Sequence, residues 1–220
     1  MRIHDPDVVY TDLGLAILGA FFAWRLWKQP TRTALTTNGS IIMAALASAA
    51  LFGAIFHAFF PANTTTRAGF FAWIPVSLSI LTVATCLLAL GLRLLWPQLS
   101  TRVRRFIVVI YALSFAFVVL FVDESYGTIV RFYAPTLILF LIAAVRQAMR
   151  GTGEGNSWWL LAFSFGLSIV AALSQQARVA IHPVYFDHNA LYHVLQGIAL
   201  VMLFIGFRRV SGSNSAHRAQ

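Results

Sequence analysis

The sequence predicts an all-α integral membrane protein that folds as a bundle of seven transmembrane helices. Of its 220 residues, 59% are hydrophobic and only 10% are charged, a balance that ordinary soluble domains do not have. The hydrophobic residues fall into seven runs, each close to the roughly 20 residues that a helix needs to cross a bilayer. The runs lack the alternation of a transmembrane β-strand, and lipid cannot satisfy an open backbone, so helices must carry the crossings.

The first three runs are separated by residues that end helices. The predicted spans are 8–29, 40–60 and 69–95. The helix is expected to be interrupted in the first link by Pro30, Asn38 and Gly39. The second link consists of residues 61–66 and the third of residues 97–101. Each span is therefore bounded by a short polar segment.

The last four runs follow the same pattern. The predicted spans are 103–122, 127–148, 157–180 and 187–208. Residues 123–127, 151–156 and 183–187 supply the polar links between them.

The spans and links use nearly the whole chain. Residues 1–210 are therefore predicted to form a single transmembrane domain, and residues 211–220 a short cytoplasmic tail that is disordered. The single cysteine, Cys86, lies inside an apolar run. A disulfide framework and a Cys-x-x-Cys metal site are therefore excluded, and any metal must be held by histidine and carboxylate.

Basic residues gather at one end of the predicted helices. Twelve of the 16 lysines and arginines lie at the end that carries the C-terminus, against four at the other. Basic residues favour the cytoplasmic side, so the N-terminus is predicted outside and the C-terminus inside, in a multi-pass protein of the bacterial inner membrane. Basic loops that face anionic lipid explain the formal net charge of +9 without nucleic acid.

The same orientation places most other ionisable groups on the outer side. Six of the seven acidic residues and five of the six histidines fall there. His57 closes the second span, whereas His188 and His193 open the seventh. Ionisable groups at membrane depth are costly, so several at one depth indicate a site.

Helical spacing sorts the side chains of the seventh span. At about 100° per residue, Asn189, His193 and Gln196 lie within a stripe of about 60°, whereas His188 points about 140° away from His193. Asp187 precedes the helix and is expected to be its N-cap.

Several features resemble the alkaline ceramidase and CREST superfamily of membrane hydrolases. They are the seven spans, the N-out orientation, the histidine that closes span two, and the pair Tyr192 and His193 within DHNALYHVLQ. In that superfamily a Ser-xxx-His lies on the second span, an aspartate near the third and a His-xxx-His on the seventh, and the three histidines hold zinc. His57 matches the span-two histidine and His193 the second histidine of span seven. The chain departs from the pattern at Gly53, at Asn189 and in the third span, which has no aspartate.

This resemblance, to an uncharacterised bacterial branch, implies a zinc-dependent hydrolase that acts on a lipid amide or ester at the outer side of the membrane. His57, His188 and His193 would hold the zinc, with His188 one position away from the ligand that Asn189 replaces. Catalytic zinc keeps three protein ligands and an open position for water.

Two acids are candidates for the chemistry of such an enzyme. Zinc lowers the pKa of bound water and polarises a carbonyl, and Asp12 or Asp123 would act as base or orient a ligand. Asp12 lies about one turn inside the first span and needs a partner, whether a histidine, an arginine or a cation. Asn189, Gln196 and Tyr192 are the expected contacts to the substrate or to the ligands.

A non-catalytic heptahelical protein is the alternative. It would bind a lipid, a small ligand or a partner protein through its polar outer cavity, and candidate lining residues are Gln175, Gln176, Arg178, Tyr133 and Thr136.

The sequence also bears on two other cofactors. Retinal is excluded because the only lysine, Lys28, lies at the cytoplasmic edge of span one. Haem stays open as a rival to zinc, since His57 and His193 could hold iron axially. The oligomeric state is left open.

Overall fold

The computed structural model describes residues 3–30, 32–60, 66–150, 155–182 and 185–216. Within these residues the chain forms seven helices and no strand longer than an isolated bridge. The helices are α1 (Pro6–Trp27), α2 (Ala34–Phe59), α3 (Arg67–Leu95), α4 (Thr101–Phe121), α5 (Tyr126–Met149), α6 (Gly155–Gln176) and α7 (His188–Ala216). All seven are long and apolar enough to cross a membrane, which confirms the all-α seven-helix bundle.

Helix α2 begins six residues earlier than the span that we predicted from residue 40. Thr33 and Thr36 form a capping box, in which each side chain accepts a hydrogen bond from the backbone N–H of the other. Asn38 was predicted to interrupt the helix, but it lies inside α2 and its side chain donates to the carbonyl of Ala34, 2.7 Å away. Gly39 lies against Phe207 of α7, where a Cβ would be 2.9 Å from the ring. The glycine therefore serves close helix packing and not a turn.

The last two helices also differ from prediction. Helix α6 ends at Gln176, before the expected 180, because Arg178 takes a left-handed conformation with φ of 54°. Its N–H donates to the carbonyl of Gln175, which closes the helix end. Helix α7 continues to Ala216, so residues 211–216 of the predicted disordered tail are helical. Residues 217–220 lie outside the described residues.

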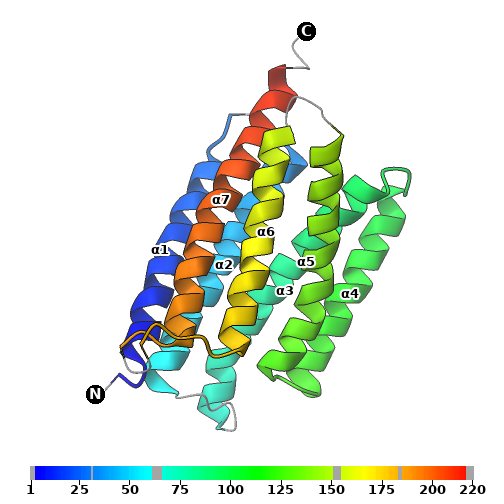
Figure 1. Ribbon diagram of the computed structural model, residues 1–220. Coiled ribbons are helices and arrows are strands. Elements are labelled where there is room, and N and C mark those ends of the chain that lie inside the picture. The colour runs from blue at the N-terminus through cyan, green and yellow to red at the C-terminus, as the bar shows by residue number, and fades with distance from the viewer. Residues whose placement is uncertain (1–2, 31, 61–65, 151–154, 183–184, 217–220) are drawn as a thin grey trace.

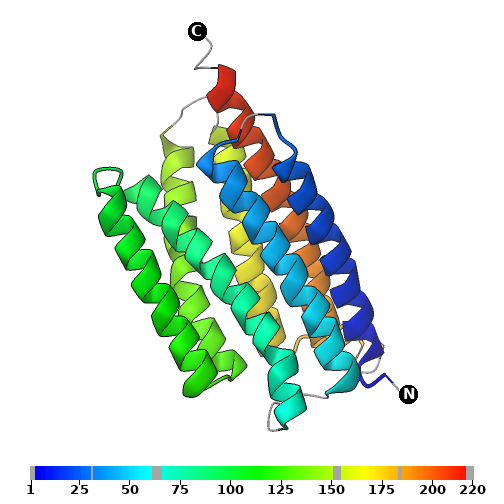
Figure 2. The same ribbon diagram turned by 180° about the vertical axis from the view of Figure 1, so that it is seen from behind.

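The two ends of the described chain lie at opposite ends of the bundle, as an odd number of crossings requires (Figure 1). Helix α4 lies at one edge, beside α3 and α5, and the other helices surround a common core (Figure 2). Only 11% of the α4 span is buried, against 39% to 56% of each other span. The core contains Met43, Leu87, Phe140, Leu161 and Phe207.

Helices α1 and α2 approach closely because small residues meet at their contact. A Cβ on Gly19 would lie 3.1 Å from the Cβ of Ala47. Such contacts between small residues are typical of helices packed within membranes. Closer to the N-terminus, Val9 of α1 packs against Ala54 and Ala58 of α2, and this contact positions the polar groups described next.

Candidate functional site

A carboxylate and an imidazole form a buried pair between α1 and α7. Asp12 Oδ1 lies 3.2 Å from His193 Nε2, and the two side chains are 6% and 10% exposed. A carboxylate at this depth in a membrane is stable only with a partner. His193 is therefore the partner that Asp12 was predicted to need.

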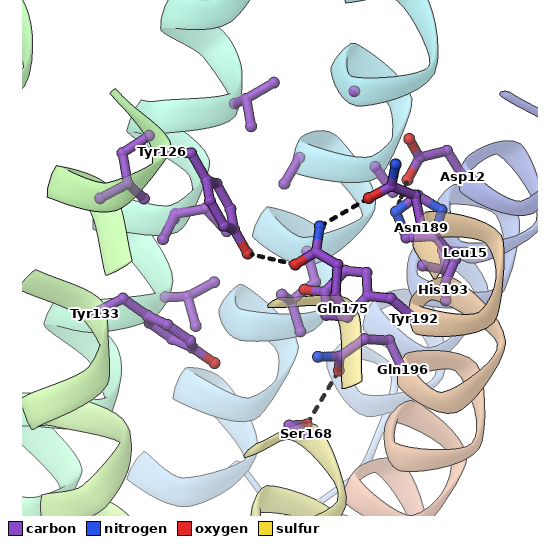
Figure 3. A pocket seen from close by; sticks show the side chains of 18 of the residues that line it. Asp12, Leu15, Tyr126, Tyr133, Ser168, Gln175, Asn189, Tyr192, His193 and Gln196 are labelled. Atoms are coloured by element: carbon purple, nitrogen blue, oxygen red, sulfur yellow. Dashed lines mark hydrogen bonds and ion pairs between the residues drawn. The ribbon is translucent and has the colours of Figure 1, made fainter. Parts of the chain in front are cut away.

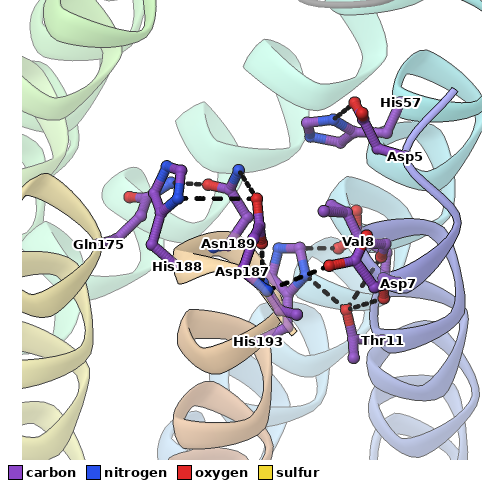
Figure 4. Close-up of polar contacts among 12 residues, drawn as sticks. Asp5, Asp7, Val8, Thr11, His57, Gln175, Asp187, His188, Asn189 and His193 are labelled. Atoms are coloured by element: carbon purple, nitrogen blue, oxygen red, sulfur yellow. Dashed lines mark hydrogen bonds and ion pairs between the residues drawn. The ribbon is translucent and has the colours of Figure 1, made fainter. Parts of the chain in front are cut away.

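Thr11 holds the second nitrogen of the same imidazole. Its Oγ1 lies 3.0 Å from His193 Nδ1 and also within hydrogen-bonding distance of the carbonyls of Asp7 and Val8 (Figure 4). When Thr11 donates to a helix carbonyl, Nδ1–H donates to Thr11 and the Nε2 lone pair faces Asp12. One proton then lies between Asp12 and His193, and the pair can take up or release a proton as a unit.

Gly53 on α2 makes room for this pair. A Cβ on Gly53 would lie 3.0 Å from Asp12 Oδ2, so the serine that the ceramidase superfamily has at this position would displace the carboxylate. In the described part of the chain, no side chain or backbone group hydrogen-bonds to Oδ2. Asp12 thus keeps one oxygen for a further partner.

A cavity of about 520 Å³ lies beside the pair, and its lining residues come from α1, α2, α3, α5, α6 and α7 and from the segment before α5 (Figure 3). This volume is within the range of about 300–1,000 Å³ that is usual for small-molecule sites. Polar residues line the end near the N-terminus and include Asp12, His57, Tyr126, Asn189 and His193. Deeper in the bundle the lining is apolar and includes Ile42, Leu46, Val83, Leu200 and Leu203.

A chain of hydrogen bonds joins three helices at the polar end of the cavity (Figure 3). Tyr126 donates to Gln175 Oε1 over 3.3 Å, and Gln175 Nε2 donates to Asn189 Oδ1 over 2.9 Å. Asn189 in turn donates to Asp187 Oδ2 over 3.2 Å. The amides of α6 and α7 are therefore held in set orientations on the cavity wall.

Three α7 residues line the cavity as their helical spacing predicted, namely Asn189, His193 and Gln196. Tyr192, which the spacing did not include, lines it as well. Gln196 also accepts a hydrogen bond of 3.0 Å from Ser168 on α6.

The residues proposed to line the cavity of a binding protein are partly in place. Gln175 and Tyr133 line it, whereas Gln176, Arg178 and Thr136 do not belong to its wall.

The three predicted zinc ligands have separate partners. His57 lines the same cavity as His193, and its Nδ1 lies 3.6 Å from Asp5 Oδ2. His188 Nδ1 lies 3.6 Å from Asp187 Oδ2, and His188 does not line the cavity. No three histidine, cysteine or acidic side chains of the described ranges form a group that could hold a metal ion.

Asp187 caps α7, and Asp123 accepts hydrogen bonds from Ser125, the N-cap of α5, and from Thr128. Asp187 Oδ1 accepts from the N–H groups of Asn189 and Ala190, 2.8 and 2.9 Å away, which confirms the predicted N-cap of α7. Asp123 lies between α4 and α5, outside the cavity. Hydrogen bonds from the Thr128 hydroxyl, and then from the backbone and hydroxyl of Ser125, lower the pKa of Asp123. This carboxylate therefore stabilises the start of α5, and the structure does not bring it to Asp12.

Sequence reasoning missed three contributors to the site. Thr11 orients His193, Tyr126 joins the hydrogen-bonded wall, and Trp73 lines the cavity and donates from its indole to the Glu124 carbonyl over 2.9 Å. Tyr126 and Trp73 lie near span ends, where aromatic residues are expected in an interfacial belt, so their positions do not indicate a site. Only Thr11 could have been predicted as a site residue, because it directly precedes Asp12 within the first span.

Comparison with protein families places this bundle in a wider group. The model of a family of unknown function, DUF6962, matches residues 8–211. The chain belongs to this family. The DUF6962 match extends from α1 into α7 and includes Asp12, His57 and His193. No curated protein and no solved structure was found to match the chain. The DUF6962 match does not refer to ceramidases, so that resemblance stays a prediction.

Proposed function

We propose that this protein is a heptahelical membrane protein that binds an amphiphilic molecule, a lipid or lipid-like small ligand, in the cavity beside Asp12. The cavity itself carries the proposal, because its wall is polar at one end and apolar at the other. A ligand of matching polarity would place its headgroup near Asp12 and His193 and its apolar part near Ile42 and Leu203. Such a site is mostly apolar with a few positioned polar groups, as ligand sites generally are.

The polar end of the cavity faces the outer side in the orientation that we propose. The N-terminus lies at the end of the bundle where α1 begins and α7 starts (Figure 1), which is the end that carries Asp12, Asn189 and His193 of the cavity wall. Twelve of the 16 basic residues lie toward the other end. The positive-inside rule supports an N-out, C-in protein of the bacterial cytoplasmic membrane. The headgroup would then reach the cavity from the outer leaflet.

Photolabelling with a dodecanol that carries a diazirine tests the proposal in nanodiscs. We expect labelled peptides from the cavity walls of α2, α5 and α7, and loss of this labelling in Ala50→Phe, because a phenyl ring would occupy the cavity that Ala50 lines. Ala20→Phe is the matched control, since Ala20 is exposed on α1. Labelling that is confined to lipid-facing helix surfaces and is unchanged in Ala50→Phe would contradict the proposal.

A zinc-dependent hydrolase of a lipid amide or ester is the second candidate. It is supported by Asp12, His57 and His193, which line one cavity. In the observed arrangement, however, both nitrogens of His193 already have partners, and His57 pairs with Asp5. The residues present therefore do not form a zinc site, and we assign no reaction step to the metal.

Metal analysis separates the two candidates. We expect protein purified without added metal to contain no stoichiometric zinc, because His193 is committed to Thr11 and Asp12. About one zinc per chain, lost in both His57→Ala and His193→Ala, would instead establish the hydrolase site. His188→Ala distinguishes a three-histidine site from one completed by Asp12, since only the former loses zinc in that variant.

A further inference from the structure

Aromatic rings make up much of the cavity wall near its polar end. They belong to Phe56, Trp73, Tyr126, Tyr133 and Tyr192. In Figure 3, Tyr126 and Tyr133 of α5 extend toward Gln175, Tyr192 and Gln196 across the open space. Aromatic faces attract cations through their ring quadrupoles, and aromatic cages are a common site for ammonium groups.

The charges of the cavity also favour a cation. Its acidic lining residues are Asp12 and Glu124, and no lysine or arginine occurs among the described residues that line it. The Asp12 side chain is 6% exposed and keeps Oδ2 without a hydrogen-bond partner, while its Oδ1 is paired with His193. A phosphate or carboxylate headgroup would enter a low-dielectric site without a fixed cation to pair with, and this is unfavourable.

We propose that the headgroup recognised in this cavity is an organic ammonium, a protonated or methylated amine on an apolar chain. This inference rests on the proposed amphiphile site and specifies its ligand. The ammonium would lie at Asp12 Oδ2, with the aromatic rings around it, and the apolar chain would extend toward Leu203. The cation would supply the charge that balances an ionised Asp12, and a neutral His193 would then donate from Nε2–H to Asp12 Oδ1 and accept at Nδ1 from the Thr11 hydroxyl.

Competition against the diazirine dodecanol tests this selectivity. Decylamine, decanol and decyl phosphate share one chain and differ in headgroup, and at neutral pH the amine is protonated. In nanodiscs of phosphatidylcholine, we expect decylamine to compete at a concentration at least tenfold lower than decanol, and decyl phosphate to be the weakest of the three. Asp12→Asn should remove this advantage of the amine while decanol still competes.

Two further variants control for charge and folding. Asp7→Asn removes the same charge from the same helix, and its amide oxygen can still accept from the Asp187 N–H, so the advantage of the amine should persist. Tyr133→Leu keeps the Asp12 and His193 pair intact but removes a ring from the cavity wall, and it should reduce the advantage several-fold even where Asp12→Asn does not fold.

The outcomes distinguish failure of the ammonium inference from failure of the proposed amphiphile site. Competition by decanol or decyl phosphate at least as strong as that of decylamine would overturn the ammonium inference and leave the amphiphile site standing. An amine advantage that persists in both Asp12→Asn and Tyr133→Leu would also overturn it. Failure of the diazirine probe to label the cavity, with no competition from any of the three, would remove the amphiphile site itself.

Discussion

Replacing His193 with alanine is expected to destabilise the bundle by about 1–3 kcal/mol, the usual cost of leaving a buried polar group without its hydrogen-bond partner. The variant leaves the Asp12 carboxylate, 6% exposed, without the imidazole 3.2 Å away. It also leaves the Thr11 hydroxyl without its contact to His193 Nδ1. Thermal unfolding of the purified protein in detergent, or steric trapping in bicelles, measures the loss.

A double-mutant cycle with Asp12 separates the pair from simple loss of packing. Asp12→Ala combined with His193→Ala should cost clearly less than the sum of the two single variants, because no buried group is then left unpaired. His188→Ala is the matched control, since the pair of His188 with Asp187 is 31% and 26% exposed. We expect that control to cost less than about 1 kcal/mol. Equal losses in His188→Ala and His193→Ala, or full additivity in the cycle, would contradict the importance of the buried pair.

Gly206→Ala is expected to destabilise the contact between α6 and α7 by about 1–3 kcal/mol through overpacking. A Cβ on Gly206 would lie 2.6 Å from Leu161 Cδ2 and 3.4 Å from the Leu161 backbone nitrogen. Leu161 is fully buried in the core, so its side chain has little free space into which it could move. The same unfolding measurements record the effect.

Gly166→Ala on α6 is the control for this overpacking. In the described part of the chain, no atom beyond the adjoining residues and the backbone of its own helix lies within 4 Å of a Cβ built at Gly166, and alanine favours a helix by up to about 1 kcal/mol over glycine. Unchanged or raised stability is therefore expected. A loss in Gly166→Ala as large as in Gly206→Ala would show that helix propensity, and not the contact with Leu161, decides the result.

The helices themselves were predictable because their signal is local. A run of about 20 apolar residues must form a helix in lipid whatever surrounds it, so all seven were found. The ends of the helices were harder to predict where a residue type occurs both in turns and inside helices. Gly39 is a common turn residue, yet here it lies inside α2 so that Phe207 can approach. The capping box of Thr33 and Thr36 then sets the true start of that helix.

The candidate site was only partly predictable for a related reason. Helical spacing placed Asn189, His193 and Gln196 on one face, and the structure shows all three on the cavity wall. Spacing does not say which other helix lies opposite that face. The zinc hypothesis grouped His193 with His57 and His188, whereas the structure pairs His193 with Asp12 of α1.

By itself, the sequence determined the class of the protein, its seven helices, the unequal share of basic residues at its two ends and the residues that share a face of α7. Each of these follows from composition or from helical periodicity, which act within one segment. Only the tertiary structure decided that Asp12 and His193 meet, that Gly53 leaves space for them, and that a cavity with aromatic walls lies beside them. Those features depend on which helices pack together, and this is decided by contacts between residues far apart in the chain.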